Sequence, residues 1–371
     1  MTPQLTDMIA AGSCGALVAI TEPVTIRILR RAAAIDIPNG RSSHSVPTPR
    51  GGGAPIAAGL VLAALLIRSP AAIALAIAVA AFAVIGLADD LSGLPARTRL
   101  AWQGTGATAA AAVVVLHLHL PPLIAVAAVL AVAIWVTGFV NAFNFMDGVN
   151  GISAAHALIG GAAFVVLGEW RPDPFLVAVG GATAAGALAF LPWNAVRARV
   201  FLGDVGSYGL GAALAMLAAC AVFHGVPAEA AVAPLALYLA DTAWTLQRRF
   251  RAGERLLEAH RSHVYQQLCD LGWSHLRVTA VTGGATVLLC LLGAASLTGD
   301  TALRAGADVV ALIVLVTYLR APALLGRTSA QLENTAQLEN TAQLENTAQL
   351  ENTAQLENTA QLETARQLER A

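Results

Sequence analysis

Residues 123–139 read LIAVAAVLAVAIWVTGF, without one charged side chain, and residues 140–151 continue as VNAFNFMDGVNG. A helix needs roughly 20 mostly apolar residues, with 17 to 25 tolerated, to cross the hydrocarbon core of a bilayer. The first stretch therefore predicts a transmembrane helix, and the second predicts a polar loop at the membrane boundary. This alternation decides the fold, because it recurs along nearly the whole chain.

The recurring pattern predicts an all-α protein, a polytopic integral membrane bundle of about 11 transmembrane helices. Of the 371 residues, 57% are hydrophobic and only 12% are charged, about half the charged fraction of a typical soluble domain. A soluble core of this size cannot hide so much apolar surface. This argues against a soluble enzyme, a nucleic-acid binder and a disulfide scaffold. The predicted spans lie near residues 8–29, 54–67, 71–87, 100–118, 123–139, 152–167, 174–191, 206–223, 228–246, 275–297 and 307–325.

Arginine divides the connecting loops into two sets. All 22 basic residues are arginine, and the loops on one side hold seventeen of them, whereas the other side holds only Arg68, Arg171 and Arg304. Basic residues accumulate in cytoplasmic loops of membrane proteins. The asymmetry predicts an N-terminus outside the membrane and a C-terminus in the cytoplasm. The unusual polar motifs all fall on the predicted cytoplasmic side.

Two cytoplasmic loops carry charges suited to an anionic ligand. Arg50 precedes three glycines, residues 51–53, whose exposed backbone N–H groups can wrap an anion. Asp89 and Asp90 are adjacent at a helix end, where they need a cation or hydrogen-bond donors. Magnesium bound to a diphosphate is one such partner. The alternatives are an ordinary turn-rich loop and a solvated helix end.

The next two motifs combine amides with carboxylates. Asn141, Asn144 and Asp147 recur every three residues, which lines them along one side of a helix end. Oxygen atoms of this kind suit a hard cation or a nucleotide base, and a simple Asn/Gly turn is the alternative. Asp204 follows Gly203 at a helix start, where it is either an N-terminal cap or a metal ligand beside a phosphate-attracting helix end.

A histidine pair ends the set of motifs. His260 and His263 would share a face on a helix, with Arg261 between them. A two-histidine zinc site would lack a third ligand, and a basic helix on anionic lipid is the other alternative. Five motifs on one face favour an enzyme acting on a cytosolic substrate. A transporter instead places polar groups near the bilayer midplane.

Together these residues resemble the polyprenyl-phosphate N-acetylhexosaminyl-1-phosphate transferases of bacterial surface-polysaccharide synthesis, glycosyltransferase family 4. The likeness spans residues 8–327, and its Pro-Thr-Pro-Arg and His-Arg-x-His motifs resemble the branch that initiates O-antigen. It is carried by RSSH at 41–44, PTPRGGG at 47–53, DD at 89–90, NAFNFMDGVNG at 141–151, FLGDVGS at 201–207 and HRSH at 260–263.

The resemblance implies transfer of a sugar 1-phosphate from a UDP-N-acetylhexosamine to undecaprenyl phosphate, with release of UMP. It also implies Mg²⁺, with Mn²⁺ as an alternative, and an active site on the cytoplasmic face of the bacterial inner membrane. No nucleic-acid partner is expected, and a homodimer is left open. A transporter of a nucleotide-linked or lipid-linked sugar and a catalytically dead scaffold are the competing hypotheses.

Residue roles follow from the same resemblance. Asp204 is the expected Mg²⁺ ligand, with Asn144 close to the metal. The residues expected to bind the donor or acceptor include Asn141, Asp147, Asn150, Asn194 and Phe201, with Phe201 stacking on the uridine. We expect Asp89 and Asp90 to face the lipid phosphate and the metal. The diphosphate and sugar are expected to be held by Arg50, His260, Arg261 and His263. Two positions depart from the family pattern: Asn150 stands where an aspartate is common, and His156 where a glutamate is common.

The C-terminal segment differs from everything before it. From residue 330 the hexapeptide Ala-Gln-Leu-Glu-Asn-Thr repeats, and its period of six forms no heptad seam on a helix. We therefore expect two parts, a membrane transferase domain over 1–327 and a low-complexity cytoplasmic tail over 328–371. The tail is expected to be flexible or marginally helical, with no catalytic part.

Overall fold

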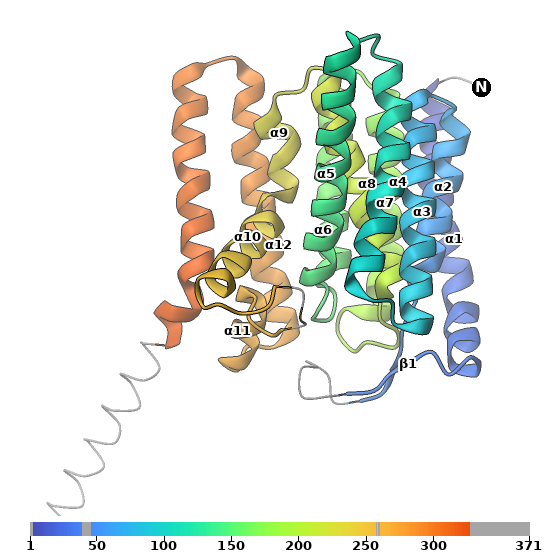
Figure 1. The fold of residues 1–371 in the computed structure, drawn as a ribbon, viewed down its shortest axis with the longest axis vertical. Coiled ribbons are helices and arrows are strands. Elements are labelled where there is room, and N and C mark those ends of the chain that lie inside the picture. The colour runs from blue at the N-terminus through green and yellow to red at the C-terminus, as the bar shows by residue number, and fades with distance from the viewer. Residues whose placement is uncertain (1–2, 39–45, 257, 259, 327–371) are drawn as a thin grey trace, which may run out of the picture. The chain divides into compact units, whose positions relative to one another are not determined.

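The computed structural model describes residues 3–38, 46–256, 258 and 260–326, and it is overwhelmingly helical over these ranges (Figure 1). The chain divides into two compact units, Met1–Leu319 and Arg320–Ala371, and the first is described below. The RSSH motif at 41–44 and the predicted tail lie outside the described residues. The predicted domain boundary at residue 327 therefore stays a prediction.

The helices follow one another with short connections. In chain order they are α1 Pro3–Arg31, α2 Ala54–Ile67, α3 Pro70–Ser92, α4 Ala96–Leu116, α5 Pro122–Met146, α6 Ile152–Trp170, α7 Pro174–Asn194, α8 Gly203–Phe223, α9 Ala228–Val232, η1 Ala233–Leu235, α10 Ala236–Arg251, α11 Val264–Asp270, α12 His275–Gly293, η2 Ala294–Thr298 and a last helix, Thr301–Gly326. One small antiparallel sheet pairs β1 (Ile35–Asp36) with β2 (Thr48–Pro49).

The expectation of an all-α polytopic membrane protein is confirmed, since eight of the described helices are long and apolar enough to cross a bilayer. The remaining three predicted spans are helical but depart from the expected form. The helix α2 has only 14 residues, and α4 is less apolar than the eight. The run 228–246 breaks into α9, η1 and α10 around Pro234, which lacks the amide hydrogen that a continuous helix requires.

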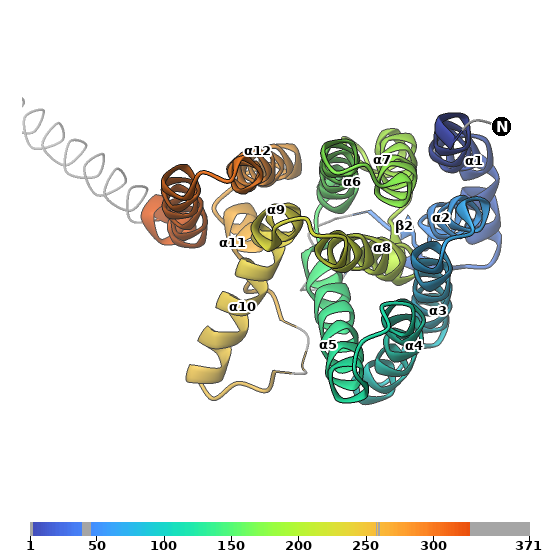
Figure 2. The same cartoon turned by 90° about the horizontal axis from the view of Figure 1, so that it is seen from above.

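The helix α8 lies at the centre of its neighbours α2, α3, α5, α6 and α7 (Figure 2). Glycines allow this close packing. A Cβ atom added to Gly53 would lie 2.2 Å from the Cα of Gly206, and one added to Gly86 would lie 2.2 Å from the backbone oxygen of Asp204. Small residues let helix backbones approach in this way in membranes. They fix the start of α8 against α2 and α3.

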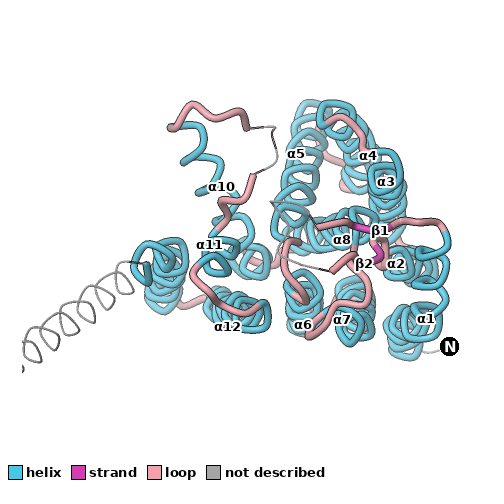
Figure 3. The backbone as a smooth tube through the Cα atoms, turned by 90° about the horizontal axis from the view of Figure 1, so that it is seen from below, coloured by secondary structure: helices cyan, strands magenta, loops and turns pink. Residues whose placement is uncertain are grey.

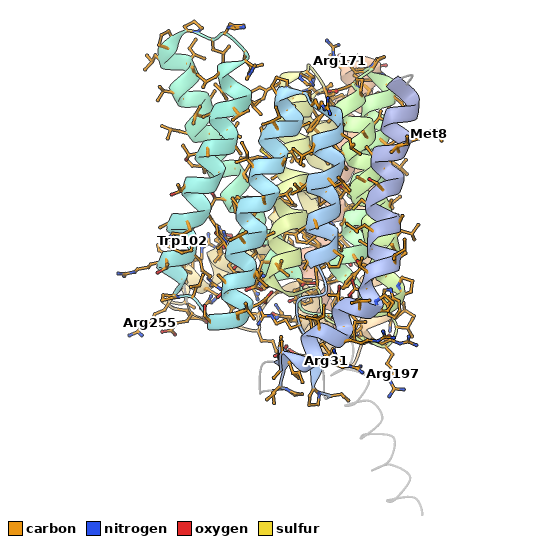
Figure 4. The ribbon with its side chains drawn as sticks, turned by 90° about the vertical axis from the view of Figure 1, so that its right-hand side faces the viewer. Met8, Arg31, Trp102, Arg171, Arg197 and Arg255 are labelled. Carbon is orange, nitrogen blue, oxygen red and sulfur yellow. The ribbon has the colours of Figure 1, made fainter. Side chains whose placement is uncertain are left out.

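The ends of the helices reproduce the arginine asymmetry. Arg31, Arg197 and Arg255 lie at one end of the bundle, and Met8 and Arg171 lie at the other (Figure 4). The small sheet and several connecting loops cover the arginine-rich end near the base of α8 (Figure 3). The predicted motif loops therefore gather on one face. Which face meets the cytoplasm remains a prediction.

Candidate active site

The N-terminus of α8 is capped by a carboxylate from another helix. Asp90, near the end of α3, accepts the backbone N–H groups of Asp204 and Val205, each at 3.0 Å. These N–H groups have no partner within their own helix, so an external acceptor satisfies them. Asp204 lies in the first turn of α8, and its carboxylate does not serve as the cap. Its side chain instead meets Arg50 from the segment before α2, Asp89 from α3 and Asn144 from α5.

Arg50 joins two of the three carboxylates. Its Nε lies 2.6 Å from Asp90 Oδ1, and its Nη2 lies 2.7 Å from Asp204 Oδ1. The backbone holds it there, because Phe201 donates to Pro49 O at 2.8 Å and Arg50 pairs with Phe201 in a parallel bridge. Burial alone would lower the pKa of Arg50, but the charges of Asp204 and Asp90 raise it above its ordinary value. The arginine therefore stays charged.

Asp89 is held by partners that the sequence motifs did not include. Arg99 Nη1 lies 2.6 Å from its Oδ2, the backbone N–H of Leu94 donates to Oδ1 at 2.7 Å, and Tyr208 donates to Oδ2 at 3.2 Å. Tyr208 lies four residues after Asp204 on α8, so the two share a helix face. That spacing is a signal from which Tyr208 could have been found.

The amides at the end of α5 reach two different partners. Asn144 donates through Nδ2 to Asp204 Oδ1 at 2.9 Å and to Ser207 Oγ at 3.0 Å. Asn141, about one turn earlier on α5, donates to Gln103 Oε1 at 2.7 Å. The three-residue spacing does place both amides on a helix, and Asp147 ends it. Burial raises the pKa of Asp147 to about 6.

Three of the expected substrate-binding residues lie where neighbouring segments are bonded together, with Asn194 as the last residue of α7. Asn194 is buried, accepts from the backbone N–H of Gly151 at 2.7 Å and donates to Val200 O at 3.0 Å. Asn150 uses its backbone to contact His275 and Thr279. The Asn194 amide thus joins the loops on which Asn150 and Phe201 lie. Their contact with a nucleotide stays a prediction.

The histidine motif adopts a different local structure from the expected helix. His260 lies in the loop before α11, and His263 is the N-cap of that helix. The two rings are nevertheless stacked, with centroids 4.9 Å apart. Burial, together with the neighbouring His263, lowers the pKa of His260 to about 4. The prediction of a shared helical face was wrong, but the rings still come together.

The loop around the histidines is tied to the rest of the site from two sides. Tyr265 donates to the backbone oxygen of Phe145 at 3.0 Å, beside the end of α5. The ring centroid of Phe145 lies 6.0 Å from that of His263 and 6.4 Å from that of His260. Arg261 pairs with Asp270 at 2.9 Å. The histidines therefore lie next to the loop that carries Asp147.

Comparison with known proteins identifies the family. The chain is 30% identical over 367 residues to the decaprenyl-phosphate N-acetylglucosaminephosphotransferase of Mycolicibacterium smegmatis, covering 85% of this chain and 90% of the relative. A model of glycosyl transferase family 4 matches residues 72–222. The chain belongs to glycosyl transferase family 4. The matched segment contains the aspartates of α3 and α8 and the amides of α5.

Other family 4 relatives differ in the acceptor or sugar that their names give. A probable undecaprenyl-phosphate N-acetylglucosaminyl 1-phosphate transferase of Bacillus subtilis is 26% identical over 272 residues, covering 70% of this chain and 76% of the relative. A phospho-N-acetylmuramoyl-pentapeptide-transferase of a Synechococcus species is 30% identical over 248 residues, covering 60% and 71%. None of these names mentions O-antigen, so that role stays a prediction.

His156 lies away from the charged groups of this family 4 site. It is buried in α6, its ring stacks on Tyr238 with centroids 3.7 Å apart, and Phe143 meets its edge at 5.9 Å. Neither ring nitrogen has a hydrogen-bond partner among the described residues. The departure from the family's glutamate thus falls in an aromatic cluster behind the α5–α6 loop.

The donor set at Asp204 fits a magnesium ion that shares its shell with substrate. Over the described ranges, no three His, Cys, Asp or Glu side chains gather as a closed metal site. Magnesium is usually held by one or two carboxylates together with phosphate oxygens and water. Asp204 and the nearby Asp89 supply carboxylate oxygens for such a partial set, and Asn144 would add its Oδ1 after rotation of its amide, whose Nδ2 donates to Asp204 Oδ1 at 2.9 Å. The residues present therefore fit the ion.

Proposed function

We propose that this chain transfers an N-acetylhexosamine 1-phosphate from a UDP-sugar to a polyprenyl phosphate such as undecaprenyl phosphate. The products are a polyprenyl-diphosphate sugar and UMP. The observation that carries the proposal is the meeting of Asp89, Asp90 and Asp204 with Arg50 at the N-terminus of α8. Two anionic reactants need such a mixture of cation, helix dipole and metal-binding carboxylates.

Acceptor binding is supported by a groove on the outer side of α4 and α5. The groove holds about 930 Å³ and is lined mainly by apolar and small side chains. Its lining includes Leu100, next to Arg99, and Thr137, whose backbone oxygen accepts from Asn141. A polyprenyl chain lying in this groove would bring its phosphate toward Arg99 and Asp89. The reacting phosphate would then lie beside the carboxylate cluster.

The donor would be held at the carboxylate cluster. Asp204 and Asn144 would hold Mg²⁺, or Mn²⁺ as the alternative, which supplies positive charge to the diphosphate oxygens when bound. Arg50 would bind the same diphosphate. The expectation that the N–H groups of residues 51–53 wrap this anion was wrong, because all three donate to the backbone oxygens of Phe201 and Leu202. Asp147 and Phe201 would hold the uridine, and His260 and His263 the sugar. These roles rest on the family pattern and on the proximity of the loops.

In the proposed reaction, an acceptor phosphate oxygen attacks the sugar-bearing phosphorus, and the bond from that phosphorus to UMP breaks. The second pKa of a phosphate monoester lies near 6, so the acceptor is already mostly dianionic at pH 7. Removal of a proton from the acceptor by Asp89 or Asp90 would therefore accelerate the reaction little. Their contribution is to orient Arg99 and the start of α8, which positions the reactants.

We further propose that the arginine-rich end faces the cytoplasm of a bacterial inner membrane, with the N-terminus outside. The product would initiate O-antigen or a similar surface polysaccharide. The motifs PTPR and HRSH support this branch. A transporter is disfavoured, because Asp90 and Asp204 lie at helix ends, near the end of α3 and at the start of α8, whereas a transporter would place polar groups near the bilayer midplane.

The direct test uses the full chain in nanodiscs with Mg²⁺, labelled UDP-N-acetylhexosamines, and undecaprenyl or decaprenyl phosphate. We expect UMP release together with a labelled lipid, and loss of both in Asp204→Asn. Asp300→Asn is the matched control, because Asp300 caps the last helix at the opposite end of the bundle and Asn caps helices equally well. Failure to form UMP with any sugar and either acceptor would contradict the proposal.

A further inference from the structure

Asp241 on α10 is completely buried and has polar partners from three segments. Every one of these partners can donate to it. They are Thr245 Oγ1 at 3.2 Å, His263 Nδ1 at 3.0 Å, the backbone N–H of Val264 at 3.1 Å and 3.2 Å, and Tyr318 Oη at 2.8 Å. A carboxylate so placed acts only as an acceptor. Its position is fixed from three directions.

We propose that Asp241 is a positioning residue for His263 and that Tyr318 on the last helix supports it. The proposal rests on the transferase function given above, in which His263 meets the donor sugar. Because Asp241 Oδ1 accepts a hydrogen bond from Nδ1 of His263, the imidazole ring carries its proton on Nδ1 and leaves Nε2 as a hydrogen-bond acceptor. A carboxylate partner commonly fixes the tautomer and orientation of a functional histidine in this way.

The Nε2 atom of His263 is free for such a role. It is buried and has no hydrogen-bond partner among the described residues. Buried polar atoms normally have a partner, and exceptions call for an explanation. The ring is confined by His260 at 4.9 Å and Tyr265 at 5.9 Å. A hydroxyl or amide N–H of the sugar is the class of group that Nε2 would accept.

Tyr318 connects this arrangement to a helix that follows every sequence motif. Its side chain is buried, and its hydroxyl donates to Asp241 Oδ2, whereas His263 uses Oδ1. The tyrosine therefore holds the far side of the same carboxylate. Loss of its hydroxyl leaves Asp241 in place but with one restraint fewer, so its effect is smaller than that of removing the charge.

A purely structural role would be capping of α11, since the N–H of Val264 also donates to Asp241. A kinetic double-mutant cycle separates the two. In the full chain, Asp241→Asn and His263→Gln are each expected to slow UMP release by about 10- to 100-fold. If Asp241 acts through His263, adding Asp241→Asn to His263→Gln costs little more. If Asp241→Asn slows UMP release as much in the His263→Gln variant as it does in the wild-type protein, the proposal is overturned.

Tyr318→Phe provides a milder variant that keeps the fold. It is expected to lower turnover by about 3- to 10-fold, below the roughly 10- to 100-fold range for outer partners of functional histidines, because it removes one hydroxyl and no charge. Trp135→Phe is the control, because it also removes a hydrogen bond between helices, a partly buried one from Nε1 to Ala215 O at 2.9 Å. Equal losses of turnover in both variants would count against a specific role for Tyr318.

A second measurement does not depend on turnover. In ¹⁵N-histidine-labelled protein at pH 8, the His263 signals are identified by their loss in His263→Gln. We expect a protonated Nδ1 and an unprotonated Nε2, with this preference lost in Asp241→Asn. A wild-type ring protonated at Nε2 would overturn the proposal. A fixed Nδ1–H tautomer in a protein that releases no UMP would instead locate the failure in the transferase function.

Discussion

Asp90 holds the helix on which Asp204 lies, because its two carboxylate oxygens each accept one backbone N–H from the first turn of α8. The two aspartates therefore have opposite effects on the stability of the folded protein: Asp90 raises it and Asp204 does not. Asp90 satisfies donors that would otherwise be buried, whereas Asp204 adds a negative charge beside Asp89 and Asp90. Two acids of one cluster, from α3 and α8, thus perform different tasks.

The first prediction compares alanine substitutions at these positions in the absence of divalent cations. Asp90→Ala is expected to destabilise the protein by about 0.5–2 kcal/mol, as loss of a helix cap does. Asp204→Ala is expected to leave stability unchanged or raise it, because it relieves repulsion between carboxylates. Thermal unfolding in detergent measures both. A larger loss of stability in Asp204→Ala than in Asp90→Ala would contradict this division of roles.

The second prediction concerns Arg50. Lysine carries the same charge but cannot contact Asp90 and Asp204 through two arms of a planar group. Arg50→Lys is therefore expected to lower kcat/KM by roughly tenfold or more, equivalent to about 1.4 kcal/mol of transition-state stabilisation. Arg197→Lys is the control, since Arg197 is exposed at the same end of the bundle. Similar losses of kcat/KM in both variants would contradict the idea that Arg50 acts by bridging Asp90 and Asp204.

The third prediction concerns pH. Burial raises the folded-state pKa of Asp147 from 3.8 to about 6. Its ionisation therefore opposes folding, and the penalty is absent below pH 3.8 and grows as the pH rises toward 6. Asp147→Asn should raise the melting temperature at pH 8 relative to wild type, with the gain disappearing near pH 4. A gain of equal size at both pH values would show that ionisation is not the cause.

The fourth prediction concerns Glu22 in α1. Its carboxyl group is fully buried, neither oxygen has a hydrogen-bond partner among the described residues, and a Cβ on Gly52 would lie 2.8 Å from Oε1. Burying a polar group unpaired costs about 1–3 kcal/mol. Glu22→Met should therefore raise the melting temperature. Glu22→Gln keeps two unpaired polar atoms and should therefore raise the melting temperature less. An equal increase of the melting temperature in both variants would argue against this explanation.

The sequence predicted the parts of the site that depend on local spacing or on the family motifs. Asn144 and Asp204 meet as expected, and the helical placement of Asn141 and Asn144 follows from their three-residue interval. Proline disfavours a helix interior, but Pro234 alone did not identify the interruption, because Pro23 and Pro192 lie inside the continuous helices α1 and α7. The apolar composition of residues 228–246 obscured it.

Other contacts depend on packing between distant segments and had no local signal. Asp241 and Tyr318 are 77 positions apart, and the bond between them follows from how α10 meets the last helix. The pairing of Arg99 with Asp89 likewise depends on the turn between α3 and α4. For His260 and His263, the helical interval was the wrong guide, since ring stacking in a loop brings them together.

The short helix α2 has a consequence for where the chemistry takes place. Its 14 residues rise only about 21 Å, against a hydrocarbon thickness of about 30 Å. That leaves about 9 Å of the hydrocarbon thickness to the segments that flank the helix, among them the glycine segment 51–53 before it. Such a mismatch is met by local thinning of the bilayer. The anionic head of a lipid substrate can then reach the site without being lifted out of its leaflet, and turnover should depend on the acyl-chain length of the surrounding lipid.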